Sequence, residues 1–283
     1  MSPTWQGPPP PERPAISARG WLRVVLRGVP MAFLVFGGLL LTLLIRLAER
    51  PLHGLHRPWT PTLTVFVCRN ALRILGLRLV QRGQPMTGSG VVVANHSSWL
   101  DIFTLNAGKR IYFVSKSEVA DWPGIGWLAR ATGTVFIERD PRQAAQQTET
   151  IRDRLLAGHK LLFFPEGTST DGTVVLPFKP TLFQAFFDPG LREEISVQPV
   201  SLRYVPPEGA DPRFYGWYGD MTFGGHLLLM LSAPRHGRVI VRYHAPVPVR
   251  GAPDRKSLAK SCETAVRAGF EADPDVVDAQ VAG

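Results

Sequence analysis

Cysteine is scarce in this chain, and its scarcity narrows the fold classes to consider. The two cysteines, Cys68 and Cys262, lie far apart and belong to no CxxC or Cys/His pairing. We therefore expect neither a disulfide scaffold nor a structural zinc site, and a reducing compartment is the default. The histidines outside the motif described below have no spacing typical of metal ligands, so we expect no metal and no bound cofactor.

Motifs of several common enzyme classes are also absent. The sequence contains no GxxxxGK[ST] phosphate-binding loop and no GxSxG nucleophile elbow. A loose glycine fingerprint at Gly124–Gly126 follows Trp-Pro rather than a strand, which argues against dinucleotide binding.

Acidic residues and lysine are nearly missing from the first 82 residues. This third holds eleven arginines, no lysine and two acids, so it accounts for the whole net charge of +9 and the rest of the chain is neutral. The arginines flank apolar runs, whereas a nucleic-acid binder interleaves its charge with polar and aromatic contact residues. We expect anionic lipid head groups as the partner, and no nucleic acid.

The N-terminal third predicts a membrane-associated region. A tail with a PPPPE stretch fills residues 1–18, and residues 19–82 carry two apolar segments, Gly28–Ile45 and Leu63–Val80. The first would span about 27 Å as a helix, only just enough to cross a bilayer. Arginines crowd both of its ends, which favours two helices lying on or dipping into one leaflet over a single spanning helix.

Residues 83–283 predict the catalytic domain, which we expect to face the cytoplasm at the inner membrane. Short apolar runs alternate with helical stretches, a pattern typical of an α/β fold with a mostly parallel central sheet flanked by helices. The expected strands are 91–95, 111–115, 134–138, 160–165, 197–202 and 239–244, and the expected helices are 97–106, 122–131, 142–157, 180–187 and 254–270.

The sharpest motif is Asn-His-Ser-Ser-Trp-Leu-Asp, residues 95–101, directly after the VVVA strand. In a continuous helix His96 and Asp101 would point about 140° apart. They meet if His96 lies at the strand-to-helix corner and Asp101 folds back from the first helical turn. The carboxylate would then take the Nδ1–H and leave Nε2 as a general base. The alternative is a capping histidine beside an ordinary first-turn acid.

Other polar residues follow apolar strands. Arg139 ends the Gly-Thr-Val-Phe-Ile-Glu-Arg stretch, where it could bind a phosphate or form a surface salt bridge. Phe-Pro-Glu-Gly-Thr brings Glu166, Gly167 and Thr168 to a turn, and an ordinary exposed turn is the alternative. Lys116 and Lys179 are further candidate anion ligands, or solvated charges.

Together these segments resemble the glycerolipid acyltransferase family that includes bacterial 1-acylglycerol-3-phosphate acyltransferase. The resemblance covers roughly residues 90–205 and rests on His-x4-Asp at 96–101, Gly-x-Val-Phe-Ile-x-Arg at 133–139, Phe-Pro-Glu-Gly-Thr at 164–168 and Val-Gln-Pro-Val at 197–200. It implies that His96 is the base and Asp101 its orienting partner. It also implies that Arg139 binds phosphate and that Glu166 and Gly167 help to bind the acyl acceptor. One position departs from the pattern: Ser169 stands where many members carry arginine.

The function expected from this resemblance is acyl transfer from acyl-CoA or acyl-carrier protein to the free hydroxyl of a lysolipid, with 1-acylglycerol-3-phosphate as the first candidate acceptor. Ser169 motivates a second, a lyso-aminolipid such as lyso-ornithine lipid. A catalytically inactive lipid-binding protein is the alternative from another class. Direct transfer is expected, although Ser97 and Ser98 keep an acyl-enzyme route open. Backbone N–H groups near the helix start or at Gly167 are the expected oxyanion donors.

Overall fold

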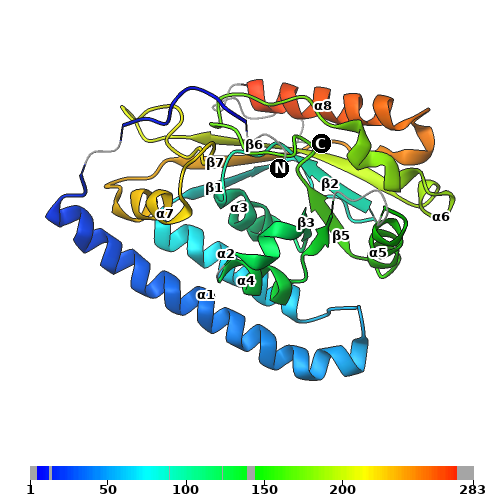
Figure 1. Cartoon of the computed structure of the whole chain (residues 1–283), viewed down its shortest axis with the longest axis horizontal. Coiled ribbons are helices and arrows are strands. Elements are labelled where there is room, and N and C mark those ends of the chain that lie inside the picture. Colours follow the sequence, from blue (N-terminus) through cyan, green and yellow to red (C-terminus); the bar gives the residue numbers. More distant parts are fainter. Residues whose placement is uncertain (1–4, 13–14, 89, 123, 139–143, 273–283) are drawn as a thin grey trace.

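A single twisted sheet, covered by helices on both faces, forms the centre of the molecule (Figure 1). The computed structural model describes residues 5–12, 15–88, 90–122, 124–138 and 144–272. Within these residues the strands are β1 (Arg78–Arg82), β2 (Gly90–Ala94), β3 (Tyr112–Lys116), β4 (Val135–Ile137), β5 (Lys160–Phe163), β6 (Ser196–Val205), β7 (Arg238–Tyr243) and β8 (Val247–Pro248).

The strand order is β1-β7-β6-β2-β5-β3-β4, with β8 beside β6. Neighbours pair in parallel except where β6 meets β7 and β8. The expected α/β class with a mostly parallel sheet is therefore confirmed. Strand β2 is buried at all five positions, as its unbroken apolar sequence requires in a sheet covered on both faces.

The helices from α2 onward divide between the two faces of the sheet. Helix α8 covers one face, while α2, α3 and α7 pack on the other (Figure 1). Their bounds are α2 Thr60–Leu75, α3 Leu100–Gly108, α4 Ile125–Thr132, α5 Ala144–Leu156, α6 Pro189–Arg192, α7 Phe223–Ser232 and α8 Arg255–Glu271, with 3-10 turns at Ser117–Asp121, Pro180–Phe187 and Val249–Gly251. The helix expected over 97–106 begins later, at Leu100, because the preceding residues form the corner that holds the site.

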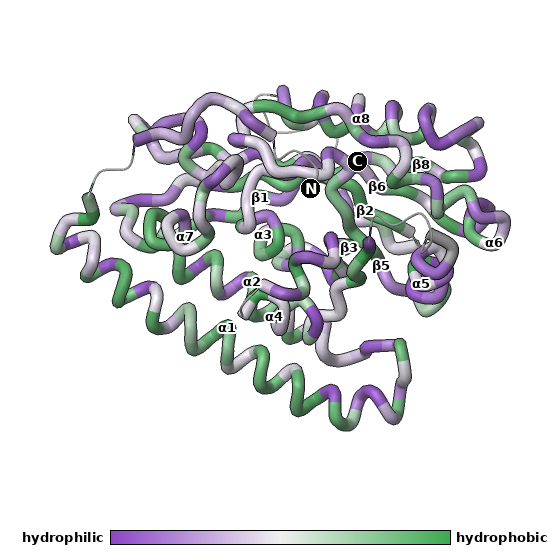
Figure 2. Tube along the Cα trace, in the orientation of Figure 1, coloured by the Kyte–Doolittle hydropathy of each residue, from purple (hydrophilic) through white to green (hydrophobic). Residues whose placement is uncertain are grey.

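Helix α1 (Ala18–His53) extends well beyond the predicted run Gly28–Ile45. The Ser17 side chain accepts the Gly20 N–H at its start, and Gly54, with a positive φ of 58°, ends it. By length and composition it is the one helix in the described chain able to cross a membrane. The helix contacts α2, α4 and α7, and apolar side chains such as Phe33, Leu40 and Leu44 are exposed. Figure 2 shows the apolar run along the helix.

A buried acid joins α1 to α2. The Glu49 carboxylate accepts the backbone N–H groups of Trp59 and Thr60, at 2.8 and 3.1 Å, and the Thr60 hydroxyl at 2.8 Å. Burial acts to raise the pKa of Glu49, but these bonds and one from Arg46 outweigh it and lower the pKa to about 2. The acid of one helix therefore caps the free N–H groups at the start of the next.

The helix predicted over Leu63–Val80 is wrong in its second part. Helix α2 ends at Leu75, where Gly76 adopts the left-handed conformation with φ of 85°. The chain then enters β1, which pairs with β7 from residue 78 onward. This segment forms a strand because it pairs with β7, which lies far along the chain. The local sequence does not reveal that pairing. The sheet thus includes residues before position 83, and the division of the chain at 18 and 82 stays a prediction.

Candidate active site

The corner between β2 and α3 brings His96 and Asp101 together. The Asn95 side chain both donates to and accepts from the backbone of Leu202, at 2.8 Å each, and so fixes the end of β2 against β6. His96 follows directly, and Asp101 folds back from the first turn of α3. His96 Nδ1 lies 2.7 Å from Asp101 Oδ2. The expected hydrogen bond is present, while the catalytic roles of the two residues stay predictions.

Four donors fix the Asp101 carboxylate. Besides His96, Oδ2 accepts the backbone N–H groups of Ser97 at 2.8 Å and Ser98 at 3.1 Å, and Oδ1 accepts the Tyr204 hydroxyl at 2.8 Å. Burial, and then the charge of Asp101, holds the pKa of Tyr204 well above its usual value, so this hydroxyl keeps its proton. The side chain of Asp101 is fully buried. A carboxylate held in this way gives the imidazole a fixed orientation.

The imidazole of His96 is supported on one side and accessible at its edge. Its ring stacks on Phe164, with centroids 4.0 Å apart and planes 12° apart. The side chain is 19% exposed, and among the described residues Nε2 has no hydrogen-bond partner. With Nδ1–H donated to Asp101, Nε2 presents a lone pair that can accept a proton.

Glu166, which follows β5, supports the corner between β2 and α3. Its carboxylate accepts the N–H of His96 at 3.2 Å and the N–H of Leu176 at 3.1 Å, and the residue is 1% exposed. Burial raises the pKa of Glu166 to about 8, against the lowering effect of these two bonds. The structure thus gives Glu166 a role in positioning the backbone of His96. Its predicted contact with the acyl acceptor stays a prediction.

The structure places Gly167, Thr168, Lys116 and Lys179 at the carboxyl edge of the sheet. Gly167 has a φ of 73°, and a Cβ built on it would lie 2.8 Å from Lys179 Nζ, so this lysine covers the glycine. The Thr168 hydroxyl accepts the Trp5 N–H at 3.2 Å. Lys116 ends β3 at the same edge and is half-buried. Arg139 lies outside the described residues.

Hydrogen bonds tie three segments into one rim. The N–H of Thr170 donates to the His96 carbonyl at 3.0 Å, and the N–H of Trp217 donates to the Ser97 carbonyl at 2.8 Å. The Ser169 hydroxyl donates to the Trp217 carbonyl at 2.6 Å. At the position where many relatives in the resembled family carry arginine, this chain therefore uses a neutral side chain to join two loops.

The predicted oxyanion donors are wrong in part. The N–H groups of Ser97 and Ser98 donate to Asp101, and the N–H of Gly167 donates to the Phe164 carbonyl at 3.0 Å. These groups are therefore already occupied. Both serine residues are at most 1% exposed, which speaks against either hydroxyl as a nucleophile.

Sequence reasoning gave no role to two residues that shape this site. Phe164 lies inside the third motif, but its stacking on His96 depends on β5 being next to β2 in the sheet. Tyr204 lies far along the chain on β6, the other neighbour of β2. The sequence shows only a tyrosine near a predicted buried strand, and this does not indicate that its hydroxyl binds Asp101.

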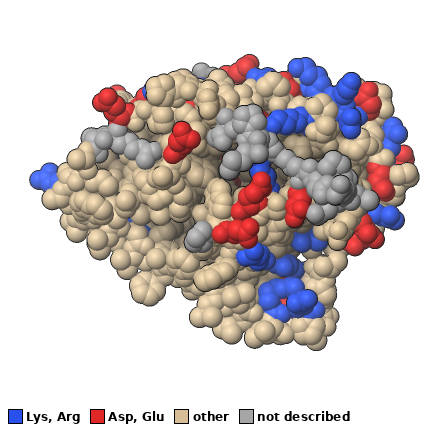
Figure 3. All heavy atoms as spheres, in the orientation of Figure 1, with Lys and Arg blue, Asp and Glu red and all other residues tan. Residues whose placement is uncertain are grey.

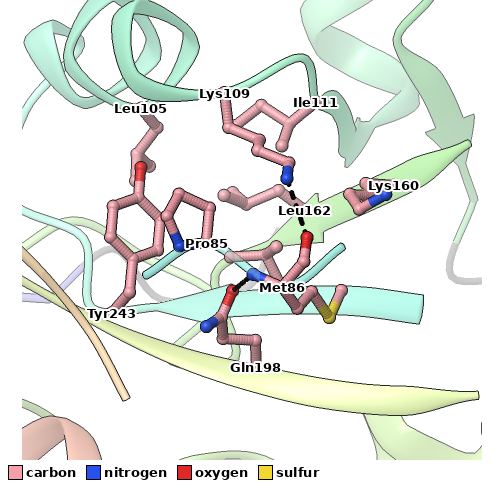
Figure 4. Close-up of a pocket in the computed structure, with 10 residues that line it drawn as sticks. Pro85, Met86, Leu105, Lys109, Ile111, Lys160, Leu162, Gln198 and Tyr243 are labelled. Atoms are coloured by element: carbon pink, nitrogen blue, oxygen red, sulfur yellow. Dashed lines mark hydrogen bonds between the residues drawn. The ribbon is translucent and has the colours of Figure 1, made fainter. Parts of the chain in front are cut away.

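A small apolar cavity lies between the C-terminal part of α3 and the sheet (Figure 4). Its walls include Met86, Leu105, Ile111 and Leu162, and the Lys109 ammonium at its margin donates to the Met86 carbonyl at 2.7 Å. Gln198 of the Val-Gln-Pro-Val motif lines it, whereas His96, Asp101 and Glu166 do not. Among the described residues, no cluster of histidine, cysteine and acidic side chains could hold a metal ion.

Comparison with known proteins identifies relatives of the chain. The sequence profile of a family described as Acyltransferase matches residues 71–203. A lyso-ornithine lipid O-acyltransferase of Rhodobacter capsulatus is 59% identical over 95% of this chain and 97% of that protein. A 1-acyl-sn-glycerol-3-phosphate acyltransferase of Neisseria gonorrhoeae is 33% identical over 74% of this chain and 80% of its own length.

A solved structure shares the fold. The crystal structure of the 1-acyl-sn-glycerophosphate acyltransferase of Thermotoga maritima superposes with a TM-score of 0.63 and covers 89% of this chain and 95% of its own. At 23% sequence identity, this likeness bears on the architecture alone.

Proposed function

The chain belongs to the acyltransferase family, and within that family we propose that it transfers a fatty acyl group to the hydroxyl of a lyso-ornithine lipid. The single observation that carries acyl transfer is the hydrogen bond of 2.7 Å between His96 Nδ1 and Asp101 Oδ2, with Nε2 left accessible. The sequence placed 1-acylglycerol-3-phosphate first and lyso-ornithine lipid second. The names of two relatives, 59% and 40% identical to this chain, support the second acceptor.

In the proposed reaction His96 Nε2 takes the proton of the acceptor hydroxyl as its oxygen attacks the thioester carbonyl of the acyl donor. A C–O bond forms and the C–S bond breaks, and the imidazolium returns the proton to the departing thiolate. Asp101 stabilises the imidazolium while it exists. A base positioned in this way contributes about 10²–10⁴ in rate. Acyl-CoA and acyl-carrier protein are both suitable donors, because each presents the same thioester.

Ser169 supports the choice of acceptor. An ornithine head group carries a carboxylate where lysophosphatidate carries a phosphate, so it needs fewer cationic ligands. In this chain the Ser169 hydroxyl is committed to the Trp217 carbonyl. Lys116, Lys179 and Arg139 remain the proposed ligands for the anionic part of the acceptor.

We further propose that α1 docks the enzyme on one leaflet. The helix is about 54 Å long at ~1.5 Å per residue. It is held to the body near both ends, by Arg23 Nε donating to the Ser232 carbonyl at 2.7 Å and by the Glu49 cap of α2. A helix fixed along its whole length cannot span a bilayer without burying the domain. Lying flat, it turns its apolar side to the lipid.

The charge distribution fits this orientation. On the face that Figure 3 shows, the surface along α1 carries few charged atoms away from its ends, and basic atoms gather near the loop that joins α1 to α2. Such an arrangement brings arginines to the head groups and leucines to the acyl chains. We propose the cytoplasmic face of the inner membrane as the location, since thioester donors are made in the cytoplasm.

An acceptor panel tests the proposed substrate. Purified protein receives one acyl-CoA and either lyso-ornithine lipid or lysophosphatidate in the same mixed micelles, and lipid mass spectrometry quantifies the products. We expect kcat/KM for lyso-ornithine lipid to exceed that for lysophosphatidate by about tenfold or more, the effect of one charged contact. A preference for lysophosphatidate would restore the first candidate acceptor. No product from either lipid would favour an inactive lipid-binding protein.

A further inference from the structure

The segment Trp5–Glu12, here called the N-terminal strap, lies against the loop that precedes α7 (Figure 1). Its contacts reach two parts of the chain. The Trp5 N–H donates to Thr168 Oγ1 at 3.2 Å, and the Trp5 ring meets Tyr218 edge-on with centroids 5.4 Å apart. Arg213 Nη1 donates to the Pro9 carbonyl at 2.9 Å. The strap therefore lies where the third motif and the loop before α7 come together.

The strap has a local structure of its own. The Trp5 ring folds back onto Gly7, so closely that a Cβ at this position would collide with the ring. Trp5 is thus held between Gly7 and Tyr218, and it is half-buried. A glycine at position 7 is what permits this packing.

Both contact points of Trp5 belong to the rim of the candidate active site. Thr168 lies between Glu166, which accepts the N–H of His96, and Thr170, whose N–H donates to the His96 carbonyl. Tyr218 follows Trp217, whose N–H donates to the Ser97 carbonyl. Trp5 therefore bridges two loops that are each bonded to the catalytic corner.

We infer that the N-terminal strap covers the acceptor side of the active site and competes with the lysolipid for Thr168. This inference rests on the proposed function. The backbone N–H of Trp5 occupies an acceptor position of the Thr168 hydroxyl, and this hydroxyl donates to the Ser169 carbonyl at 3.4 Å. A head-group N–H or O–H that donates to Thr168 at the position of the Trp5 N–H must displace Trp5.

The contacts of the strap allow it to leave. Among the described residues, two hydrogen bonds and one ring contact hold it, and most of its residues, including Pro8–Pro10, are exposed. If the closed form is populated to about 80–90%, the apparent affinity for the acceptor falls about five- to tenfold, because only the open fraction binds. The rate of acyl transfer once the acceptor is bound, kcat, is unaffected.

The test compares Trp5→Ala, a truncation lacking residues 1–12, and Pro10→Ala, a control at an exposed position of the same segment. Steady-state kinetics with a water-soluble short-chain lysolipid give KM for acceptor and donor separately. We expect KM for the acceptor to fall about five- to tenfold in the first two variants, with kcat and the donor KM unchanged. Pro10→Ala should match the wild type. Trp5→Ala keeps the backbone N–H but loses the ring that packs on Tyr218, whereas Trp5→Phe keeps an aromatic ring there and should remain close to the wild type.

Two results would overturn the strap as a competitor. An unchanged acceptor KM in the truncated protein would show that the segment does not restrict the site, and a raised KM would make it a binding wall. Thermal melting of each variant verifies its fold, and the truncation leaves the Ser17 cap of α1 in place. A wild-type protein that forms no acylated product would count against the proposed function and not against the strap.

Discussion

At the scale of single residues, two buried carboxyl groups lie beside one histidine, and their hydrogen-bond partners differ. Asp101 accepts four hydrogen bonds, one of them from the imidazole. Glu166 accepts two, both from backbone N–H groups, and burial dominates its pKa. Asp101 is therefore suited to stabilise a transient imidazolium, while Glu166 holds the backbone that carries the ring.

The pKa of Glu166 predicts a pH dependence of stability. The pKa of a glutamate in an unfolded chain is about 4.3. The pKa of Glu166 in the folded protein is about 8, so the folded state retains the proton between these two values. The free energy of unfolding should fall as pH rises from about 4 to 8, by at most ~1.4 kcal/mol per unit, and then level off.

Urea unfolding of the wild type and Glu166→Gln from pH 5 to 9 measures this dependence. The variant cannot titrate at this position, so it should gain stability relative to the wild type as pH rises. Glu208→Gln, at an exposed position, is the control and should follow the wild type. A constant difference in the free energy of unfolding between the wild type and Glu166→Gln from pH 5 to 9 would contradict the raised pKa of Glu166.

At the scale of elements, sequence reasoning succeeded where one local pattern decides the outcome. The apolar runs of β2 and β5 predicted buried strands, and the His-x4-Asp spacing predicted the fold-back of Asp101 onto His96. It failed at the end of α2, because pairing between β1 and β7 links residues about 160 positions apart. The contacts of Tyr204 and Phe164 were missed for the same reason.

The apolar run of helix α1 does not by itself decide how the helix meets the membrane. Hydropathy indicates lipid contact, but the choice between crossing and lying flat depends on which residues touch the body. Positions such as Thr42 and Glu49 are buried against it, while Phe33, Leu40 and Leu44 face outward. This alternation supports the orientation in the plane of the leaflet.

A charge on the outward side of α1 should weaken membrane binding. Leu44 is 54% exposed on this side, and Leu156, at the end of α5, is 59% exposed on another element. We expect Leu44→Glu to lower cosedimentation with anionic vesicles about tenfold or more, because it places a carboxylate among acyl chains. Leu156→Glu should bind like the wild type. Equal losses in the two variants, or none in either, would contradict docking through α1.

At the scale of the whole molecule, the parallel sheet explains why distant motifs form one site. Strands β2 and β5 are neighbours, so their carboxyl ends deliver His96 and Glu166 to the same edge, and β6 adds Tyr204 from the other side. Helix α1 and the N-terminal strap precede this framework in sequence. The proposed reaction therefore depends on His96 acting as the base for a lysolipid hydroxyl.

The most direct measurement is the rate of acyl transfer to lyso-ornithine lipid by His96→Ala, compared with the wild type at equal protein concentration. Thermal melting of both proteins first establishes that the variant is folded. We expect kcat/KM to fall by about 10²–10⁴, because the hydroxyl then has no positioned base. A folded His96→Ala protein that acylates the lipid at the wild-type rate would contradict this expectation.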